Sequence, residues 1–592
     1  MRFNRFTVRV LIMTIMVLSS VLFINSIIWA QKFDINDQQA RLEYQESIPV
    51  TMWPDHIGGE PLSYEQWRAK AGADKPFVAG LLESVSNPQK ADPDIFCIFV
   101  NYDLYPNIVS SIDTYMDDLA ADGYDAKLFR TSGGTVENFR QFLVDEYNDG
   151  MVGFVLVGDF PVPWYETYCW ESYTSFPIDL FYMDLDGVWE DLDSNGLYDS
   201  HTGDLGPEVW MGRLTASPMT LNGANEVDLL VNYFAKNHGY RTGEHFLYNR
   251  GLAYIDDDWA YWDSAWGAAV GMVYEDVTIV SEGAETIADD YENRLPQNFE
   301  SILLCAHSWP NGHSFKVGED WTGGDTYVSE VVYIDPKAHF YNMFACSNGR
   351  YVENDYMTGW YTFCDAHGLA TIGSSKTGSM LYFEYFYGPF GAGATIGEAF
   401  MAWFETIASW GFPENDVCWF YGMNLCGDPT LRHLEPAPLE ILSEDLNEAV
   451  FDEEYVDSVS VVGGMPPYAW SIIEGTLPDG LTLDGATGVV AGTCTSQGAF
   501  TFTIEARDSN VPYTADTSGY VISVNFLCGD VNNDSQINIL DITFLINYLY
   551  KDGPEPPVMT AADTDASGAI NLLDITALIA YLYKGGAELI CI

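Results

Sequence analysis

The sequence predicts a multidomain protein: an α/β region with a doubly wound parallel sheet, then an all-β sandwich, then a small helical module. Apolar runs alternate with helical periods from residue 94 to residue 435, as in chains that form parallel sheets. Residues 439–526 show strand alternation with Gly and Pro turns and lack the helical period, which is typical of a sandwich. Residues 529–586 contain two copies of an acidic loop followed by an apolar helix.

The elements of the α/β region follow from its periodicity. Pro106 opens a helical period that Gly123 ends, and Thr135 can cap a second helix. Buried strands are predicted where short apolar runs occur: Ile95–Val100, Ala126–Arg130, Gly153–Gly158, Glu208–Gly212, Ser301–Ala306 and Tyr341–Ala345.

The amino-terminal 30 residues differ from the rest of the chain. Three arginines precede an apolar run from Val10 to Trp29, and Ala30 follows. This pattern is typical of a secretory signal peptide, although the run is nearly long enough to remain as a membrane anchor. Residues 31–90 are polar and weakly patterned, which fits either a pro-segment or an amino-terminal extension.

Net charge and hydropathy exclude some partners. The formal charge of −61 repels nucleic acid phosphates and anionic lipid, so no nucleic acid partner is expected. No segment after the first 30 residues is long and apolar enough to cross a membrane, so no stable membrane insertion is expected. Ten cysteines in an exported chain make disulfides possible.

The two acidic loops have the spacing of calcium ligands. Calcium is a hard cation that needs six or more oxygens, and a twelve-residue loop supplies them from positions 1, 3, 5, 7, 9 and 12, with position 7 using its backbone carbonyl. The first loop places there Asp530, Asn532, Asp534, Gln536, Asn538 and Asp541. The second loop places there Asp563, Asp565, Ser567, Ala569, Asn571 and Asp574.

The duplication, the aspartate at loop position 12 and the single helix after each loop resemble a type I dockerin. The resemblance implies calcium as a cofactor and a cohesin-type partner on a scaffold or cell surface. Positions 10 and 11, often small and polar in cellulosomal dockerins, are Ile539–Leu540 and Leu572–Leu573 here. The repeat should bring the ends of the module together, so we predict a disulfide between Cys528 and Cys591.

A third acidic segment, "DLDSNGLYD", has the D-x-D-x-N-G start of a calcium loop. It lacks a clear acid at position 12, so a solvated acidic turn is the equal alternative. Its candidate ligands are Asp191, Asp193, Asn195 and Asp199.

Two predicted strands end in residues suited to nucleophilic catalysis. "SILLCAH" ends at His307 and "YNMFAC" ends at Cys346. Parallel strands present their carboxyl ends at one edge of a sheet, where ligands bind, so the two side chains can meet. An imidazole raises the thiolate fraction of a cysteine and can protonate a leaving amine. The alternative is a buried free cysteine and a hydrogen-bonded core histidine.

Four motifs resemble the gingipain family of cysteine peptidases, which belongs to the caspase-like clan: "FVLVGDFPVPW", "PEVWMGRL", "ILLCAHS" and "MFACSNGRY". The resemblance implies a caspase-like α/β fold with His307 as catalytic histidine and Cys346 as nucleophile. It also implies that Glu208 is the acid that orients the histidine. Ser308 departs from the glycine usual after that histidine, and His313 is expected to be a solvated loop residue.

The sandwich resembles the immunoglobulin-like modules of bacterial exported proteins, and such a module also follows the peptidase region in gingipains. The hypothesis is a secreted cysteine endopeptidase, acting on protein or peptide substrates and tethered by its dockerin. The alternatives are a non-catalytic extracellular adhesion or scaffold-binding protein with a caspase-like fold, and a carbohydrate-active enzyme. The predicted boundaries are 1–30 (signal peptide), 31–90 (extension), 91–436 (peptidase), 437–526 (immunoglobulin-like) and 527–592 (dockerin).

Overall fold

The computed structural model describes residues 37–51, 61–71, 75–86, 94–245, 247, 249–434, 438–443, 445–509, 513–534 and 536–591. The predicted signal peptide lies outside these residues. The chain divides into two compact units, Met1–Leu434 and Glu435–Ile592. Within the described residues, we find no helix with the length and apolar character needed to span a bilayer.

The first unit is built on an eleven-stranded mixed sheet with the order β1-β3-β2-β4-β9-β18-β17-β16-β12-β10-β11. Each of the six predicted strands is present to within two residues. The sheet also begins before residue 91, because β1 pairs with β3. The strands are β1 (Val78–Val85), β2 (Ile95–Asn101), β3 (Asp125–Ser132), β4 (Met151–Val157), β9 (Trp210–Leu214), β10 (Arg250–Ile255), β11 (Asp276–Val280), β12 (Ser301–Cys305), β16 (Phe340–Phe344), β17 (Ala370–Ser374) and β18 (Met423–Gly427).

The prediction of a wholly parallel sheet is wrong. Strands β3, β2, β4, β9 and β18 run one way, and β17, β16, β12, β10 and β11 run the other way. The edge strand β1 also runs opposite to its neighbour β3. The reversal occurs because β17 and β18 pair antiparallel. Apolar runs reveal strands but not their order, so the sequence could not show this junction. As a result, the two halves, apart from the edge strand β1, present their carboxyl strand ends at opposite edges of the sheet.

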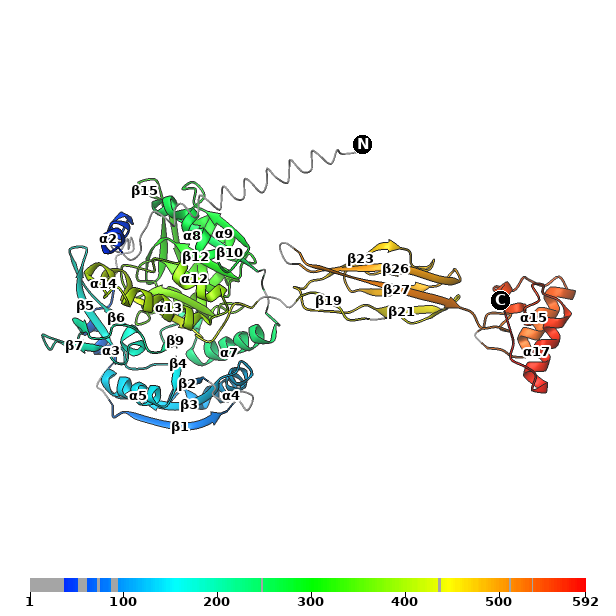
Figure 1. Cartoon of the computed structure of the whole chain (residues 1–592), viewed down its shortest axis with the longest axis horizontal. Helices are drawn as coiled ribbons and strands as arrows, with labels where there is room; N and C mark the ends of the chain where they lie inside the picture. The colour runs from blue at the N-terminus through cyan, green and yellow to red at the C-terminus, as the bar shows by residue number, and fades with distance from the viewer. Residues whose placement is uncertain are drawn as a thin grey trace. The chain divides into compact units, whose positions relative to one another are not determined.

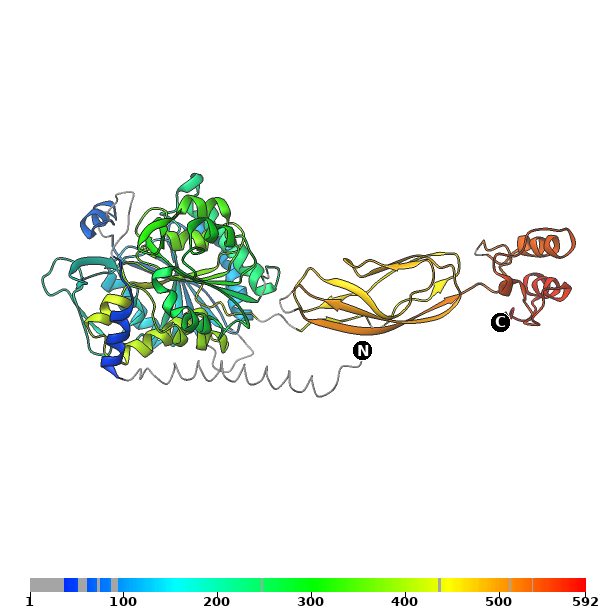
Figure 2. The same ribbon diagram turned by 90° about the horizontal axis from the view of Figure 1, so that it is seen from above.

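Helices flank the sheet (Figures 1 and 2). The two helices predicted around Pro106 and after Thr135 are α4 and α5, and the Thr135 hydroxyl accepts a hydrogen bond from the Asn138 amide at 3.3 Å. Among the described residues of the first unit, the helices of at least seven residues after β2 are α4 (Tyr105–Ala121), α5 (Val136–Asn148), α7 (Glu226–Thr242), α8 (Asp263–Val270), α9 (Ala288–Arg294), α10 (Val328–Ile334), α11 (Met357–Phe363), α12 (Glu384–Gly391), α13 (Ile396–Ala408) and α14 (Glu414–Phe420).

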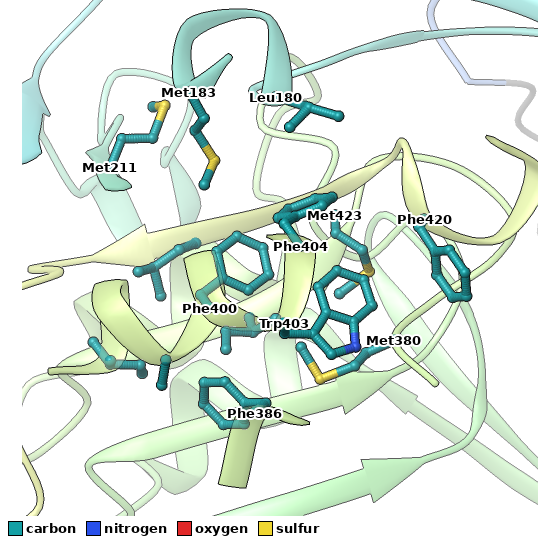
Figure 3. Packing of buried hydrophobic residues seen from close by; sticks show 14 of the residues in the cluster. Leu180, Met183, Met211, Met380, Phe386, Phe400, Trp403, Phe404, Phe420 and Met423 are labelled. Atoms are coloured by element: carbon teal, nitrogen blue, oxygen red, sulfur yellow. The ribbon is translucent and has the colours of Figure 1, made fainter. Parts of the chain in front are cut away.

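Both faces of the sheet are buried in apolar cores. Successive residues of β2 show this, because Phe96 and Ile98 belong to one buried cluster while Cys97 and Phe99 belong to the other. Side chains of a strand alternate between faces, so a central strand covered on both sides is apolar throughout. Figure 3 shows the second of these clusters, where Trp403 from α13 lies among other aromatic and methionine side chains.

Further elements of the first unit lie outside the main sheet. Among the described residues they include helices that precede the sheet and hairpins beside it: α2 (Gln38–Ser47), α3 (Tyr64–Ala71), β5 (Trp164–Cys169), β6 (Ser172–Pro177), α6 (Leu180–Met183), β7 (Val188–Glu190), β8 (Ser200–Thr202), η1 (Leu221–Gly223), η2 (Asp257–Trp262), β13 (His307–Trp309), β14 (Gly312–Val317) and β15 (Asp320–Tyr327). A disulfide that was not predicted joins Cys169 of β5 to Cys418 of α14.

The second unit contains a β region followed by a small helical region. The β region has sheets β20-β27-β26-β23 and β21-β25-β24 and a β19-β22 pair around one apolar core. Its strands are β19 (Glu440–Ile441), β20 (Ala449–Val450), β21 (Glu454–Ser458), β22 (Val461–Val462), β23 (Ala469–Gly475), β24 (Leu481–Leu483), β25 (Val489–Thr493), β26 (Gly498–Arg507) and β27 (Ala515–Asn525). The helices are α15 (Ile539–Tyr550), α16 (Met559–Ala562) and α17 (Leu572–Lys584). The predicted disulfide between Cys528 and Cys591 is present.

Phe400→Ala should destabilise the first unit by about 3–5 kcal/mol, because truncating a buried aromatic side chain leaves a cavity. Phe400 is 1% exposed. Denaturant unfolding followed by tryptophan fluorescence reports this unit, since Trp470 is the only tryptophan beyond residue 434.

Tyr333→Ala is the matched control, because this side chain is 88% exposed and its loss should change the free energy of unfolding by less than about 0.5 kcal/mol. Equal effects of the two substitutions would contradict the assigned core.

Candidate active site and calcium loops

His307 and Cys346 lie at the carboxyl ends of neighbouring parallel strands. His307 follows β12 after one residue and Cys346 follows β16 after one residue. The two strands pair in register from Ser301–Phe340 to Cys305–Phe344. Both side chains line the same small pocket. The structure therefore brings together the two residues that the strand-end argument selected.

The acid beside His307 is Asp258. It follows β10, the strand on the other side of β12, and lies in the 3-10 helix η2. Asp258 Oδ2 is 2.7 Å from His307 Nε2, and its other oxygen accepts a hydrogen bond from Lys316 Nζ at 2.9 Å. Donation from Nε2 leaves Nδ1 of a neutral imidazole able to take a proton. Three adjacent strand ends thus supply an acid, a histidine and a cysteine.

Burial and hydrogen bonding act in opposite directions on the pKa values of His307 and Asp258. Burial lowers the pKa of His307, and the hydrogen bond and charge of Asp258 act in the opposite direction. Burial acts to raise the pKa of Asp258, but hydrogen bonds from His307 and Lys316 outweigh it and lower that pKa below its ordinary value. Asp258 is therefore a carboxylate that holds the imidazole through one oxygen.

Glu208 does not have the role that the motif resemblance implied. It precedes β9, which stands four positions from β12 in the sheet, or about 19 Å at the usual strand spacing. Its carboxylate accepts a hydrogen bond from the Leu185 amide at 2.6 Å and lies with Asp184 and Asp186 in an acidic cluster. Burial raises the pKa of Glu208 to about 7. The transferred motif lacked the strand order, which places Asp258 rather than Glu208 beside the histidine.

Cys346 differs from the other free cysteines. Among the ten cysteines, all of which the structure describes, six are free, and five of these six are buried while Cys346 is partly exposed. Burial of the thiol raises the pKa of Cys346, whereas the Gly378 amide and the charge of Lys376 act to lower it. Burial in turn lowers the pKa of Lys376 to about 7. Cys346 is thus the free cysteine that is partly exposed, and burial on balance favours its neutral thiol in this state.

Ser308 and His313 both lie in the β13–β14 hairpin. The Ser308 hydroxyl lies 3.1 Å from the Trp309 carbonyl and 3.0 Å from the Gly312 carbonyl, so its side chain is held by the hairpin. The prediction that His313 is solvated is wrong, because β14 buries it completely opposite Ser308. Burial lowers the pKa of His313 to about 3, and the ring is neutral.

A segment from the amino-terminal region also lines the pocket. Pro49, Val50 and Thr51 lie there together with His307 and Cys346. The Trp259 indole nitrogen donates a hydrogen bond to the Pro49 carbonyl at 3.1 Å. With this segment in place the remaining cavity is about 10 Å³, about the size needed for a single water.

The two loops of the second unit gather carboxylates as predicted. One ligand atom from each of Asp530, Asp534 and Asp541 lies within 4.8 Å of the others, and Asp563, Asp565 and Asp574 form an equivalent group. This oxygen-only set suits calcium. The position-12 aspartates tie the loops: Asp541 accepts from the Val531 and Asn538 amides, and Asp574 accepts from the Thr564 and Asn571 amides.

The 191–199 segment also folds as a carboxylate-rich loop. Asp193 and Asp199 lie with Glu166 of β5 in another acidic group, whose ligand atoms are within 4.8 Å of one another. Asp191 instead accepts hydrogen bonds from the Asn195 and Gly196 amides. Glu166 is distant in sequence, so no local motif could include it. Calcium binding at this loop stays a prediction.

The comparisons identify the modules of the second unit. Residues 528–583 match the dockerin type I domain family, and residues 447–525 match the family described as "Putative Ig domain". The chain therefore carries a type I dockerin domain and an immunoglobulin-like domain. Neither family model extends to residues 94–434, so the gingipain resemblance remains a prediction from motifs. A search of curated proteins finds no match to this chain.

Three solved structures resemble small parts of the chain. A putative alpha-galactosidase from Bacteroides fragilis is 26% identical over 15% of this chain and 17% of its own, with a TM-score of 0.13. Protocadherin Gamma B2 domains 3–6 are 18% identical over 15% of this chain and 25% of their own, with a TM-score of 0.13. Human CDH23 EC21–23 is 14% identical over 19% of this chain and 39% of its own, with a TM-score of 0.15. The chain spans less than a fifth of the length of the first of these structures.

Removal of calcium should expose the dockerin helices. Without metal the clustered carboxylates repel one another, and a module of this size has a small core. Hydrogen exchange in α15 and α17 should increase at least tenfold in a chelator, and Asp541→Ala together with Asp574→Ala should reproduce this in calcium.

The exposed Glu555 provides the control, since Glu555→Ala removes an acid of the same module outside the loops. Unchanged exchange after chelation would contradict a structural role for calcium.

Proposed function

We propose that the first unit is a cysteine endopeptidase related to the gingipains, with a caspase-like fold. Cys346 is the nucleophile, His307 the general acid and base, and Asp258 the residue that orients His307. The single observation that carries the proposal is the position of these three residues at the ends of the adjacent strands β16, β12 and β10. A core cysteine and a core histidine have no reason to line one pocket while the histidine is also bonded to a carboxylate outside it.

The proposed reaction uses each group in turn. The Cys346 thiol gives its proton to His307, and the thiolate sulfur attacks the carbonyl carbon of the peptide bond. The carbon–nitrogen bond breaks as His307 gives that proton to the departing amine, which leaves a thioester on Cys346. A water molecule, deprotonated by His307, then attacks the thioester carbon. The acid product leaves and the thiol is restored with the proton from His307.

Asp258 acts through the histidine rather than on the substrate. Its contact with Nε2 fixes the ring and its tautomer, and its negative charge favours the imidazolium that forms during both steps. Lys316 bonds the other side of the same carboxylate, which limits its rotation. The chemistry therefore depends on a carboxylate held between two cations when His307 is protonated.

The second unit supports an extracellular setting for this activity. A type I dockerin implies calcium-dependent attachment to a cohesin, and dockerins occur in extracellular proteins. We propose that the enzyme is secreted and is held by its dockerin on a cohesin-bearing scaffold or cell surface. Protein or peptide substrates would meet it there.

Cys346→Ala should abolish peptide hydrolysis, and His307→Ala should have nearly the same effect because the two residues act as a unit. Asp258→Asn should reduce kcat/KM by roughly 10²–10⁴-fold while leaving the fold intact, because the ring loses its orienting charge. The measurement is hydrolysis of a mixed peptide library by secreted full-length protein in calcium.

Cys364→Ala is the control. Cys364 is a buried free cysteine that directly follows α11 and does not line the pocket of His307 and Cys346. The Cys364→Ala protein should therefore retain its turnover. Hydrolysis at the wild-type rate by the Cys346→Ala protein would contradict the assignment of Cys346 as the nucleophile.

A further inference from the structure

The segment that enters the candidate active site is firmly attached to the first unit. Helix α2 precedes it, and Gln45 Nε2 donates to Asp416 Oδ1 at 2.6 Å. Asn415 Nδ2 donates to the side-chain oxygen of Gln45 at 2.6 Å. Ile48 is 3% exposed and belongs to the main apolar core. These contacts fix the chain immediately before the residues that line the pocket, so the position of Val50 follows from docking of α2.

The walls around this segment are apolar and aromatic. Apart from His307, no titratable cation or carboxylate lines the pocket among the described residues. The remaining lining is Ala306, Phe344, Ala345, Cys346, Gly378, Ser379, Trp259 and Trp419. The Ser379 hydroxyl is already used, because it donates to the Met343 carbonyl at 2.9 Å.

The charged groups near His307 do not line the pocket. Asp257 accepts a hydrogen bond from the Gly318 amide through one carboxylate oxygen. Asp258 bonds His307 and Lys316, and Asp256 accepts from the Lys316 amide. Lys376 Nζ is buried and donates to the Thr377 carbonyl at 2.7 Å. A lysine or arginine side chain entering the pocket would therefore lose its hydration without gaining a carboxylate, and an acidic side chain would likewise gain no free cation.

We propose, given the peptidase function argued above, that this site is selective for peptides with an uncharged aliphatic residue at the scissile bond. Val50 is the resident example of such a side chain: it is partly buried against the main apolar core beside the dyad. The same segment excludes other peptides while it stays in place. Burial of an aliphatic side chain in this pocket lowers the free energy of binding. A charged side chain would lose its hydration without gaining an ion-pair partner, which disfavours its binding.

The first arm of the test opens the site. Val50→Asp puts a carboxylate against apolar walls, so the segment should leave and Cys346 should react with iodoacetamide at least tenfold faster than in the wild-type chain. Gln45→Ala, which removes the anchoring bonds of α2, should change the rate in the same direction. Glu46→Ala is the matched control, because Glu46 is exposed on the same helix. Equal alkylation rates in all four proteins would contradict the proposal that the Pro49–Thr51 segment occupies the site.

The second arm measures selectivity in the opened Val50→Asp protein. Three fluorogenic peptides that differ only in valine, arginine or aspartate before the cleaved amide are compared, first as substrates and then as protectants of Cys346 against iodoacetamide. The valine peptide should have a kcat/KM at least 100-fold above the others and should protect best. Faster cleavage or better protection by the arginine or aspartate peptide would overturn the proposal.

The two readouts also separate this proposal from the function on which it rests. If the valine peptide protects Cys346 but no peptide is cleaved, the endopeptidase function fails while the selectivity of the pocket stands. If peptides are cleaved without preference for valine, the peptidase function stands and the selectivity fails.

Discussion

The antiparallel junction between β17 and β18 is the constraint on which the rest of the first unit depends. Five strands on one side of the junction point their carboxyl ends to one edge, and the candidate active site occupies that edge. Loops that follow β10, β12 and β16 meet there because these strands are adjacent and parallel. Without the reversal, the strand ends of the other half would share this edge, and the site would lie in the middle of a longer row of loops.

The electrostatics of the site follow from that placement. A thiol at a sheet edge covered by aromatic side chains is desolvated, which by itself opposes formation of the thiolate. His307 is desolvated too, which opposes the imidazolium. The carboxylate of Asp258, itself bonded to Lys316, is the fixed charge that favours the protonated ring. The thiolate–imidazolium pair that the proposed function requires would therefore depend on Asp258.

Sequence reasoning recovered local features better than it recovered partnerships. The strands from β2 to β4, the Thr135 cap and the calcium loops all depend on residues near in sequence. The strand-end rule also found His307 and Cys346. The same rule would have found Asp258, since the apolar run of β10 is followed directly by three aspartates. Glu208 was misplaced because a motif carries no strand order. The burial of His313 depends on a hairpin pairing that its glycine-rich surroundings concealed.

The overall charge and the pocket act on different parts of a substrate. A net charge of −61 attracts basic peptides over a distance of about a Debye length and so affects how often they meet the protein. Under the proposed function, selectivity for the residue at the scissile bond arises within the pocket, where apolar walls replace water. Only contacts that are stronger in the transition state raise the rate of cleavage. The proposed enzyme would therefore attract basic polypeptides and still cleave them beside an uncharged side chain. The chain itself places Pro49–Val50–Thr51 in one pocket with His307 and Cys346, which a peptide would also have to enter under the proposed function.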